Sequence, residues 1–448
     1  MSDTHSVKSG ISGPATPAVS LGELALLFLK LGATAFGGPA AHIAMMEDEV
    51  VQRRGWLSRE AFLDLLGATN LIPGPNSTEM AIHIGNRKAG WPGFLVAGSC
   101  FILPAALLVT VVAAVYVRYG ALPEAAGVLY GVKPVIIAVV LQALWGLGRA
   151  ALKTKLLAIV GAAGIAFGFL GVNELIILSG SGLAVSFATW ILGQIRKGKG
   201  SLLSLGAIGP PVLITSSTAM AGAAVGVPFG LAPLFLFFLK VGSVLFGSGY
   251  VLLAFLRAGL VERWHWLNES QLLDGIAVGQ VTPGPVFTTA TFIGYLLGGL
   301  PGALVATLGI FLPGFVFVAV SGPLVPRIRR SSTAGAFLDG VNVASLALMA
   351  VVTCYLGKAA LVDLTTAALC FASLTLLIRF RLNSAWLVPG GAIIGLLNAG
   401  GSVPCAAIEH CRAFHVRPGG EKSSPGFHRE DAKCAKRTLR ASRTRNDK

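Results

Sequence analysis

Two ionisable side chains stand one helical turn apart within an apolar stretch of the chain. Glu79 and His83 are four residues apart, and Asn76 lies three residues before Glu79, so on a helix all three share one face. A carboxyl group and an imidazole in this arrangement could relay a proton. A structural hydrogen bond between the two side chains is the alternative, and the sequence leaves both open.

Breaks in the apolar stretches could bind an anion. Proline removes a backbone donor and glycine permits unusual backbone conformations, so helices are expected to break there. A helix that restarts after proline, with amide and hydroxyl side chains in its first turn, presents free N–H groups and the positive end of its dipole. A kink that serves only packing is the alternative. The candidate binding residues are Phe36, Gly37, Gly38, Pro39, Pro73, Gly74, Pro75, Asn76, Ser77, Thr78, Pro283, Gly284 and Pro285.

Four further charged residues occupy matching positions in the two halves of the chain. Lys30 and Lys240 lie inside apolar stretches, where an ionisable group costs about 2.5 to 3.5 kcal/mol on insertion. Together the two cations would suit a dianion, whereas the alternative is that each reaches the interface or loses its charge. Asp64 and Asp274 each follow a Trp-Leu pair of the kind found at membrane interfaces, which favours a structural role over coupling.

The composition requires a membrane around these residues. The 448-residue chain is 54% hydrophobic and only 12% charged, whereas soluble domains carry about 25% charged residues. Its formal net charge of +15 lies largely in short clusters between apolar segments and in the last stretch of the chain. Such clusters report membrane orientation and are too scattered for a nucleic-acid-binding face. Neither a metal site nor a nucleophile–base–acid constellation is predicted.

The apolar segments predict an all-α polytopic membrane protein with about thirteen transmembrane helices (range about 10–14), some of them broken. The first segment, 22–46, is expected to be one crossing interrupted at Phe36–Pro39, and 64–86 and 91–117 are expected to be the next two. There is no cleavable signal peptide pattern, so the first apolar segment is expected to remain in the membrane.

An internal duplication organises the chain. Residues 28–75 align with 238–285 without a gap, keeping Lys, Trp, Asp and both Pro-Gly-Pro motifs in register. Because the copies begin an odd number of segments apart, the second copy should enter the membrane from the opposite side, as in transporters built from inverted repeats. The expected domains are a cytoplasmic segment 1–20, a first repeat 21–200, a linker or additional membrane segment 201–230, a second repeat 231–400 and a basic disordered tail 401–448.

The motifs resemble those of the chromate ion transporter family in its long, two-domain form. They comprise the paired Phe-Leu-Lys-x-Gly-x-x-x-Phe-Gly motifs, the Asn70–Thr78 segment that contains Pro73-Gly74-Pro75, and the segment Gln280–Pro285. The resemblance covers essentially residues 20–400. It implies a multi-pass protein of the bacterial inner membrane that lowers cytoplasmic chromate and needs no cofactor.

The membrane potential would favour export of a dianion, because each elementary charge gains about 2.3 kcal/mol per 100 mV. The sequence therefore predicts chromate efflux by a secondary transporter driven by membrane potential, a proton gradient or both, giving chromate resistance. A transporter of sulfate or another small oxyanion is the first alternative. A membrane enzyme acting on lipid-linked phosphate and an ungated anion channel are further ones. A homodimer is compatible with the sequence.

Overall fold

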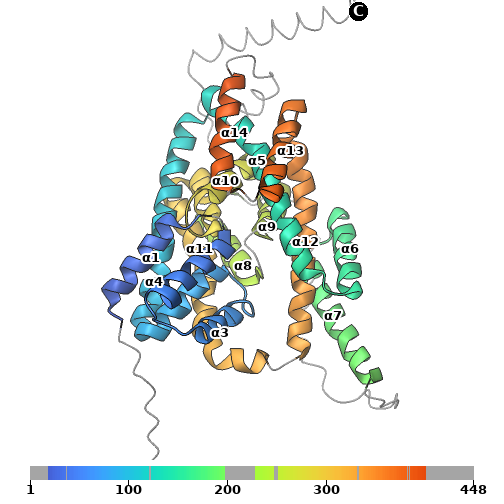
Figure 1. Ribbon diagram of the computed structural model, residues 1–448. Coiled ribbons are helices and arrows are strands. Elements are labelled where there is room, and N and C mark those ends of the chain that lie inside the picture. Colours follow the sequence, from blue (N-terminus) through green and yellow to red (C-terminus); the bar gives the residue numbers. More distant parts are fainter. Residues whose placement is uncertain are drawn as a thin grey trace, which may run out of the picture.

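The computed structural model describes residues 19–36, 38–120, 123–196, 228–246, 251–329, 332–380, 382 and 384–399. Every regular element within these ranges is helical, which confirms the predicted all-α class (Figure 1). Most of the predicted N-terminal segment 1–20 and of the linker 201–230, together with Gly37 and the tail 401–448, lies outside the described residues.

The first predicted crossing is two helices that fold back on each other. Helix α1 spans Leu21–Thr34 and begins with a capping box between Ser20 and Glu23. Helix α2 spans Gly38–Glu47 and continues into the π-helical turn η1, Asp48–Arg53. Lys30 and Glu49 would lie about 28 Å apart along one continuous helix, but Lys30 Nζ lies 2.8 Å from Glu49 Oε1. Segment 22–46 therefore forms a hairpin with its tip at Phe36–Pro39.

A second hairpin follows in each repeat. Helix α3 spans Arg59–Thr69, and after Pro73-Gly74-Pro75 the chain continues as α4, Asn76–Tyr119, which turns at Ala89 and Gly90. A Cβ built on Gly85 would lie 2.2 Å from the Gly93 carbonyl oxygen. These residues would be about 12 Å apart on a straight helix. The arm before the turn therefore packs against the arm after it. The expected crossing 64–86 is itself broken at Pro73-Gly74-Pro75 into α3 and the first arm of α4.

The first repeat ends with α5 (Pro123–Ala151), α6 (Lys155–Phe169) and α7 (Glu174–Arg196). The second repeat follows the same order. Its elements are α8 (Leu231–Val244), α9 (Leu252–Leu256), η3 (Arg257–Arg263), α10 (Glu269–Val281), η4 (Val286–Thr288), α11 (Thr289–Arg329), α12 (Ser332–Ala360), α13 (Leu364–Arg379) and α14 (Ser384–Ala399).

The turns in α4 and α11 have nearly the same backbone conformation. Ala89 and Gly90 have φ/ψ of −137°/21° and 60°/−147°, and Gly298 and Gly299 have −138°/19° and 61°/−152°. Both second residues have positive φ, which glycine adopts without steric cost. The duplication read from the sequence therefore extends to the individual turns.

Helices of each repeat pack against helices of the other repeat. Helix α5 of the first repeat packs against α13 and α14 of the second, and α12 of the second packs against α6 and α7 of the first. Figure 1 shows α6 and α7 beside the long α12. Between α5 and α14, a Cβ on Gly131 would lie 2.0 Å from the Gly391 carbonyl oxygen, so these backbones approach as closely as small residues allow. The repeats thus form one interlocked body.

Five helices are long and apolar enough to cross a membrane in the described part of the chain, including the folded α4 and α11. Four shorter apolar helices accompany them, namely Lys155–Phe169, Leu231–Val244, Leu364–Arg379 and Trp386–Asn398. Because several broken segments turn back, helix number and crossing number differ. The count of about thirteen crossings stays a prediction.

Candidate functional site

The two Pro-Gly-Pro loops lie at the centre of the exchange between repeats. The amide of Gly74 donates a 2.7 Å hydrogen bond to the carbonyl of Leu245, which follows α8 of the second repeat. The amide of Gly284 donates a 2.9 Å hydrogen bond to the carbonyl of Ala35, which follows α1 of the first. Each loop thus bonds to the helix break of the opposite repeat, and the broken helices converge in one junction.

Both loop glycines are required by conformation and by space. Gly74 has φ of 139° and Gly284 has φ of 89°, values that L side chains rarely adopt. A Cβ on Gly74 would lie 2.1 Å from Glu79 Oε1, and one on Gly284 would lie 2.6 Å from Ala105 Cβ. Glycine at these positions lets the two repeats meet.

A helix begins at the junction in each repeat. Pro75 has an extended backbone and accepts hydrogen bonds from the amides of Thr78 (2.8 Å) and Glu79 (3.0 Å), so α4 starts directly after the loop. Pro285 precedes η4 and accepts from the amide of Thr288 at 3.0 Å. The first N–H groups of such helices lack intrahelical partners, and the helix dipole adds partial positive charge. An anion would be stabilised there.

Buried polar atoms without hydrogen-bond partners gather on the elements of the junction. Within the described residues they include both Glu79 carboxylate oxygens, Thr78 Oγ1, Asn76 Oδ1, His42 Nδ1, His83 Nε2 and Gln280 Nε2. The Glu79 side chain is fully buried, and its carboxylate adjoins Gly74 and Gly314. Buried polar groups are almost always paired in proteins, so this concentration marks a place for polar ligands.

The predicted hydrogen bond between Glu79 and His83 is not formed, because neither Glu79 oxygen has a partner among the described residues. His42 instead contacts the junction, with Nε2 3.1 Å from the same Ala35 carbonyl that accepts from Gly284. Sequence reasoning missed His42. The available signal was a histidine close to the Phe36–Pro39 break, at a position where the aligned residue of the second repeat is Leu252.

The remaining predicted residues surround the junction unequally. Pro75, Ser77, Thr78, Pro283 and Pro285 are buried, whereas Pro73, Asn76, Gly38 and Pro39 are half-buried and Phe36 is exposed. Gly38 has φ of 78°, which fits a tight tip to the first hairpin. Gly37 lies outside the described residues.

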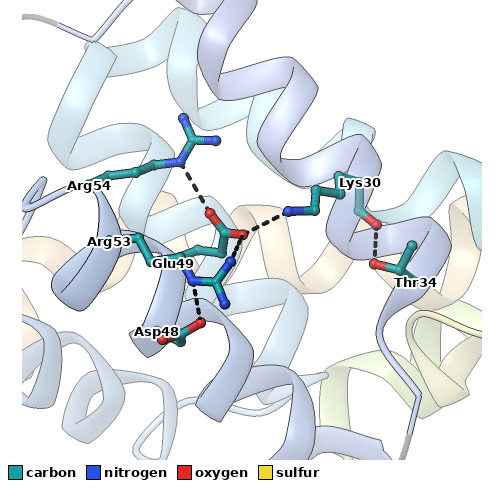
Figure 2. Close-up of polar contacts among 6 residues, drawn as sticks. All are labelled: Lys30, Thr34, Asp48, Glu49, Arg53 and Arg54. Atoms are coloured by element: carbon teal, nitrogen blue, oxygen red, sulfur yellow. Dashed lines mark hydrogen bonds and ion pairs between the residues drawn. The ribbon is translucent and has the colours of Figure 1, made fainter.

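Lys30 is engaged in a cluster of charges. Figure 2 shows the Glu49 carboxylate between the Lys30 ammonium and the guanidinium groups of Arg53 and Arg54, at N···O distances of 2.8, 3.6 and 3.3 Å. The hydrogen bond from Lys30 is the main reason why the pKa of Glu49 is lowered, and burial of the carboxylate acts in the opposite direction. The charge of Lys30 is therefore largely balanced within its own repeat.

The basic residues that follow Glu47, Asp48 and Glu49 form ion pairs with these acids. Arg53 Nε lies 2.7 Å from Asp48, and Arg59 Nε lies 3.4 Å from Glu47. In the second repeat, Arg257 stands at the position of Glu47 and Glu269 at the position of Arg59. These two residues also form an ion pair, with the acid and the base in exchanged places. Lys240 has a different environment from Lys30, since it lines a cavity of about 330 Å³ together with Arg263 and Glu174.

A model of the chromate transporter family matches the chain twice, over residues 22–186 and 232–396. The chain belongs to the chromate transporter family. The two matches are offset by 210 residues, as are α1 and α8. They support the two-repeat organisation of this family member.

Two relatives of this transporter align with most of the chain, and a third with a smaller part. A chromate transport protein of Cupriavidus metallidurans is 32% identical over 85% of this chain and 94% of its own length. A probable chromate transport protein of Synechococcus elongatus is 34% identical over 78% of this chain and 88% of its own. An uncharacterized transporter of Bacillus subtilis, YwrA, is 35% identical over only 29% of this chain but 73% of its own length. No solved structure matches the chain.

One buried ion pair of this transporter joins the repeats. Lys133 Nζ of α5 lies 3.0 Å from Asp274 Oδ1 of α10, and the Tyr116 hydroxyl donates a 2.6 Å hydrogen bond to Asp274 Oδ2. Asp274 therefore pairs with a lysine of the opposite repeat. Lys133 was missed, although a lysine inside the apolar segment 121–148 was itself a signal.

Proposed function

We propose that this protein exports chromate across the bacterial inner membrane as a secondary transporter. The observation that carries the proposal is that each Pro-Gly-Pro loop bonds to the helix break of the opposite repeat, on elements that hold two helix starts and several unpartnered buried polar atoms. The relatives from Cupriavidus metallidurans and Synechococcus elongatus, which are named as a chromate transport protein and a probable one, support chromate as the solute.

Chromate would bind in the junction through backbone and neutral polar groups. The amides at the starts of α4 and η4 would face the oxyanion, and Thr78 Oγ1 and the Gln280 amide nitrogen would donate to its oxygens. Lys30 and Lys240 remain candidate contributors to the positive potential, with Lys30 the weaker because Glu49 balances it. Helix ends directed at a midplane anion are a general transporter device.

The fold supports the inverted insertion of the repeats. Because the hairpins of the first repeat turn back, their basic residues lie on the side from which α1 starts, together with the basic ends of α5 and α7. If α8 starts from the opposite side of the membrane to α1, the C-terminal ends of α11 and α13 lie on the same side as the start of α1. The shared side then carries Arg53, Arg54, Arg59, Arg87, Lys88, Arg149, Lys153, Arg196, Arg327, Arg329 and Arg379. Lysine and arginine are retained in the cytoplasm, so we assign this side to the cytoplasm.

The membrane potential supplies a driving force for this direction. A dianion leaving a cell with a negative interior gains roughly 4.6 kcal/mol per 100 mV, twice the value for one elementary charge. Alternating access would arise from the two interlocked repeats rocking about the junction, where one backbone hydrogen bond joins each loop to the opposite helix break.

Glu79 gives the site a means of proton coupling. Its carboxylate is fully buried beside Gly74. A negative charge there would repel a dianion and cancel the positive potential of the helix N-termini. Glu79 would therefore be protonated when chromate is bound and could bind the positive helix ends itself when chromate is absent. Proton binding and chromate binding at this site would then favour each other, and a proton that left with the dianion would reduce the gain from the potential to about 2.3 kcal/mol per 100 mV.

Flux into proteoliposomes under an imposed potassium diffusion potential tests the proposal. Net chromate uptake is expected when the interior is positive and should stop when the potential is abolished. Whole cells expressing the protein should accumulate less chromate than cells without it. Uptake that ignores the potential, or cells that accumulate more chromate, would contradict export.

Sulfate is the second candidate solute, because it is also a tetrahedral dianion that the same donors would bind. Competition separates the two. Excess sulfate should reduce labelled chromate uptake only weakly if chromate is preferred, and should abolish it if sulfate is the better substrate.

A further inference from the structure

We propose that Lys240 and Arg263 form a second oxyanion site, at which the transported anion pauses beside the junction. The proposal rests on the proposed function and adds a binding step on one side of it. Its observations are a cavity of about 330 Å³, two cations that line it, and the occupied counterpart of this place in the other repeat.

The first repeat shows how such cations hold an anion. Lys30 and Arg53 both contact the carboxylate of Glu49, at 2.8 and 3.6 Å, and Glu49 exposes only 10% of its side chain. The chain itself supplies this carboxylate. It fills the space between α1 and η1, as Figure 2 shows.

The second repeat keeps the cations and lacks the carboxylate. By the 210-residue offset, Lys240 corresponds to Lys30, Arg263 to Arg53, and Gly259 to Glu49. Lys240, Arg263 and Gly259 all line the cavity. Where the first repeat has a carboxylate, the second has Gly259 packed against the ring of Phe237, and the cavity beside them is lined by the two cations.

The charge of the cavity suits an external oxyanion. Within the described residues, neither Lys240 nor Arg263 takes part in an ion pair, in contrast to Lys30 and Arg53. Glu174, at the start of α7, is the one acidic residue of the lining, which leaves a net charge of +1 before an anion binds.

The position of the cavity links it to the junction. Lys240 precedes Leu245 by five residues, or about 7.5 Å along α8, and Leu245 accepts the hydrogen bond from Gly74. With the repeats inverted as proposed, the site lies toward the periplasm, and the Glu49 cluster lies toward the cytoplasm.

A comparison of the two vesicle orientations tests this site. Lys240→Gln and Arg263→Gln should each raise the chromate concentration for half-maximal flux about 10-fold when chromate is offered from the periplasmic side, as expected for loss of one charge-assisted contact. From the cytoplasmic side this concentration should change less than about 2-fold. Lys240→Arg should restore the wild-type value, and Lys358→Gln, at an exposed lysine, should match the wild type throughout.

Each alternative result is distinct. Wild-type vesicles without chromate flux would refute the proposed function itself. Wild-type flux with unchanged half-saturation in both variants, or with equal changes from both sides, would refute the second site. An effect of Lys240→Gln that appears only in vesicles rich in anionic phospholipid would reassign the cavity to a lipid and overturn the proposal. Melting temperatures of the purified variants near that of the wild type exclude misfolding as the cause.

Discussion

The Glu79 carboxylate packs directly against Gly74, so that a methyl group on Gly74 would lie 2.1 Å from Glu79 Oε1. The loop glycine and the buried acid thus occupy one small space at the junction of the repeats. Any account of transport through this junction has to treat the two residues together.

Gly74→Ala should lower the melting temperature and abolish chromate flux. The substitution forces an unfavourable backbone conformation, at a cost of about 1–3 kcal/mol, and adds the clash with Glu79. Adding Glu79→Ala should recover part of the lost stability by removing the clash. Gly146→Ala is the matched control, because a Cβ at this helical glycine meets nothing within 4 Å. Equal melting temperatures for the two alanine variants would contradict the geometry.

Glu79→Gln should remove a pH dependence of chromate transport. Glutamine mimics the protonated acid, so the variant should bind chromate at high pH as well as at low pH. In the wild type, deprotonation of Glu79 should weaken binding as the pH rises. Protonation of chromate itself affects both proteins equally, so the difference between the two pH profiles is the measurement. Superimposable profiles would exclude Glu79 as the coupling residue.

Lys133→Met should destabilise the protein strongly, because it leaves the buried Asp274 carboxylate without its cation. Removing one partner of a buried pair costs about 3–5 kcal/mol. The double variant with Asp274→Asn should lose less than the sum of the single losses in thermal unfolding. Lys153→Met is the control, since its ion pair with Asp339 is largely exposed and worth about 1 kcal/mol or less. A loss at Lys133 no greater than at Lys153 would show that the ion pair does not hold the repeats together.

Glu49→Gln should flatten the acid side of the stability profile. The pKa of Glu49 is lowered from 4.5 in the folded protein, chiefly by Lys30. The ionised carboxylate therefore stabilises the fold above about pH 4.5, and this stabilisation is lost as the pH falls through the lower folded value. The effect should be about 1 kcal/mol or less because Lys30 is more than half exposed. The measurement is the free energy of unfolding of the wild type and the variant across this pH range. A difference between the two that does not change with pH would contradict the assignment.

The duplication and the helix breaks could be predicted because glycine, proline and charged residues keep their register within an apolar background. In the structure, the hydrogen bonds of Gly74 and Gly284 join each Pro-Gly-Pro loop to the helix break of the other repeat.

The return of the first segment could not be predicted, because apolar composition does not distinguish a crossing helix from a hairpin. The contact between Lys30 and Glu49 decides this point. The pairing of Lys133 with Asp274 also escaped prediction, since it depends on how helices of different repeats pack. Sequence spacing carries information about neighbours on one helix, but not about partners on distant ones.

The hydroxyl of Thr78 offers the most direct test of whether chromate passes through the junction. Thr78→Val preserves the shape of a side chain whose Oγ1 has no partner among the described residues, while Thr110→Val removes a hydroxyl that donates to the Ala106 carbonyl within α4. Chromate uptake into everted vesicles at a fixed potential is the measurement. Thr78→Val should raise the half-saturating chromate concentration about 5-fold or more, as expected for loss of a buried hydrogen bond to a charged ligand, and Thr110→Val should not. Identical half-saturation in the wild type and Thr78→Val would contradict the account.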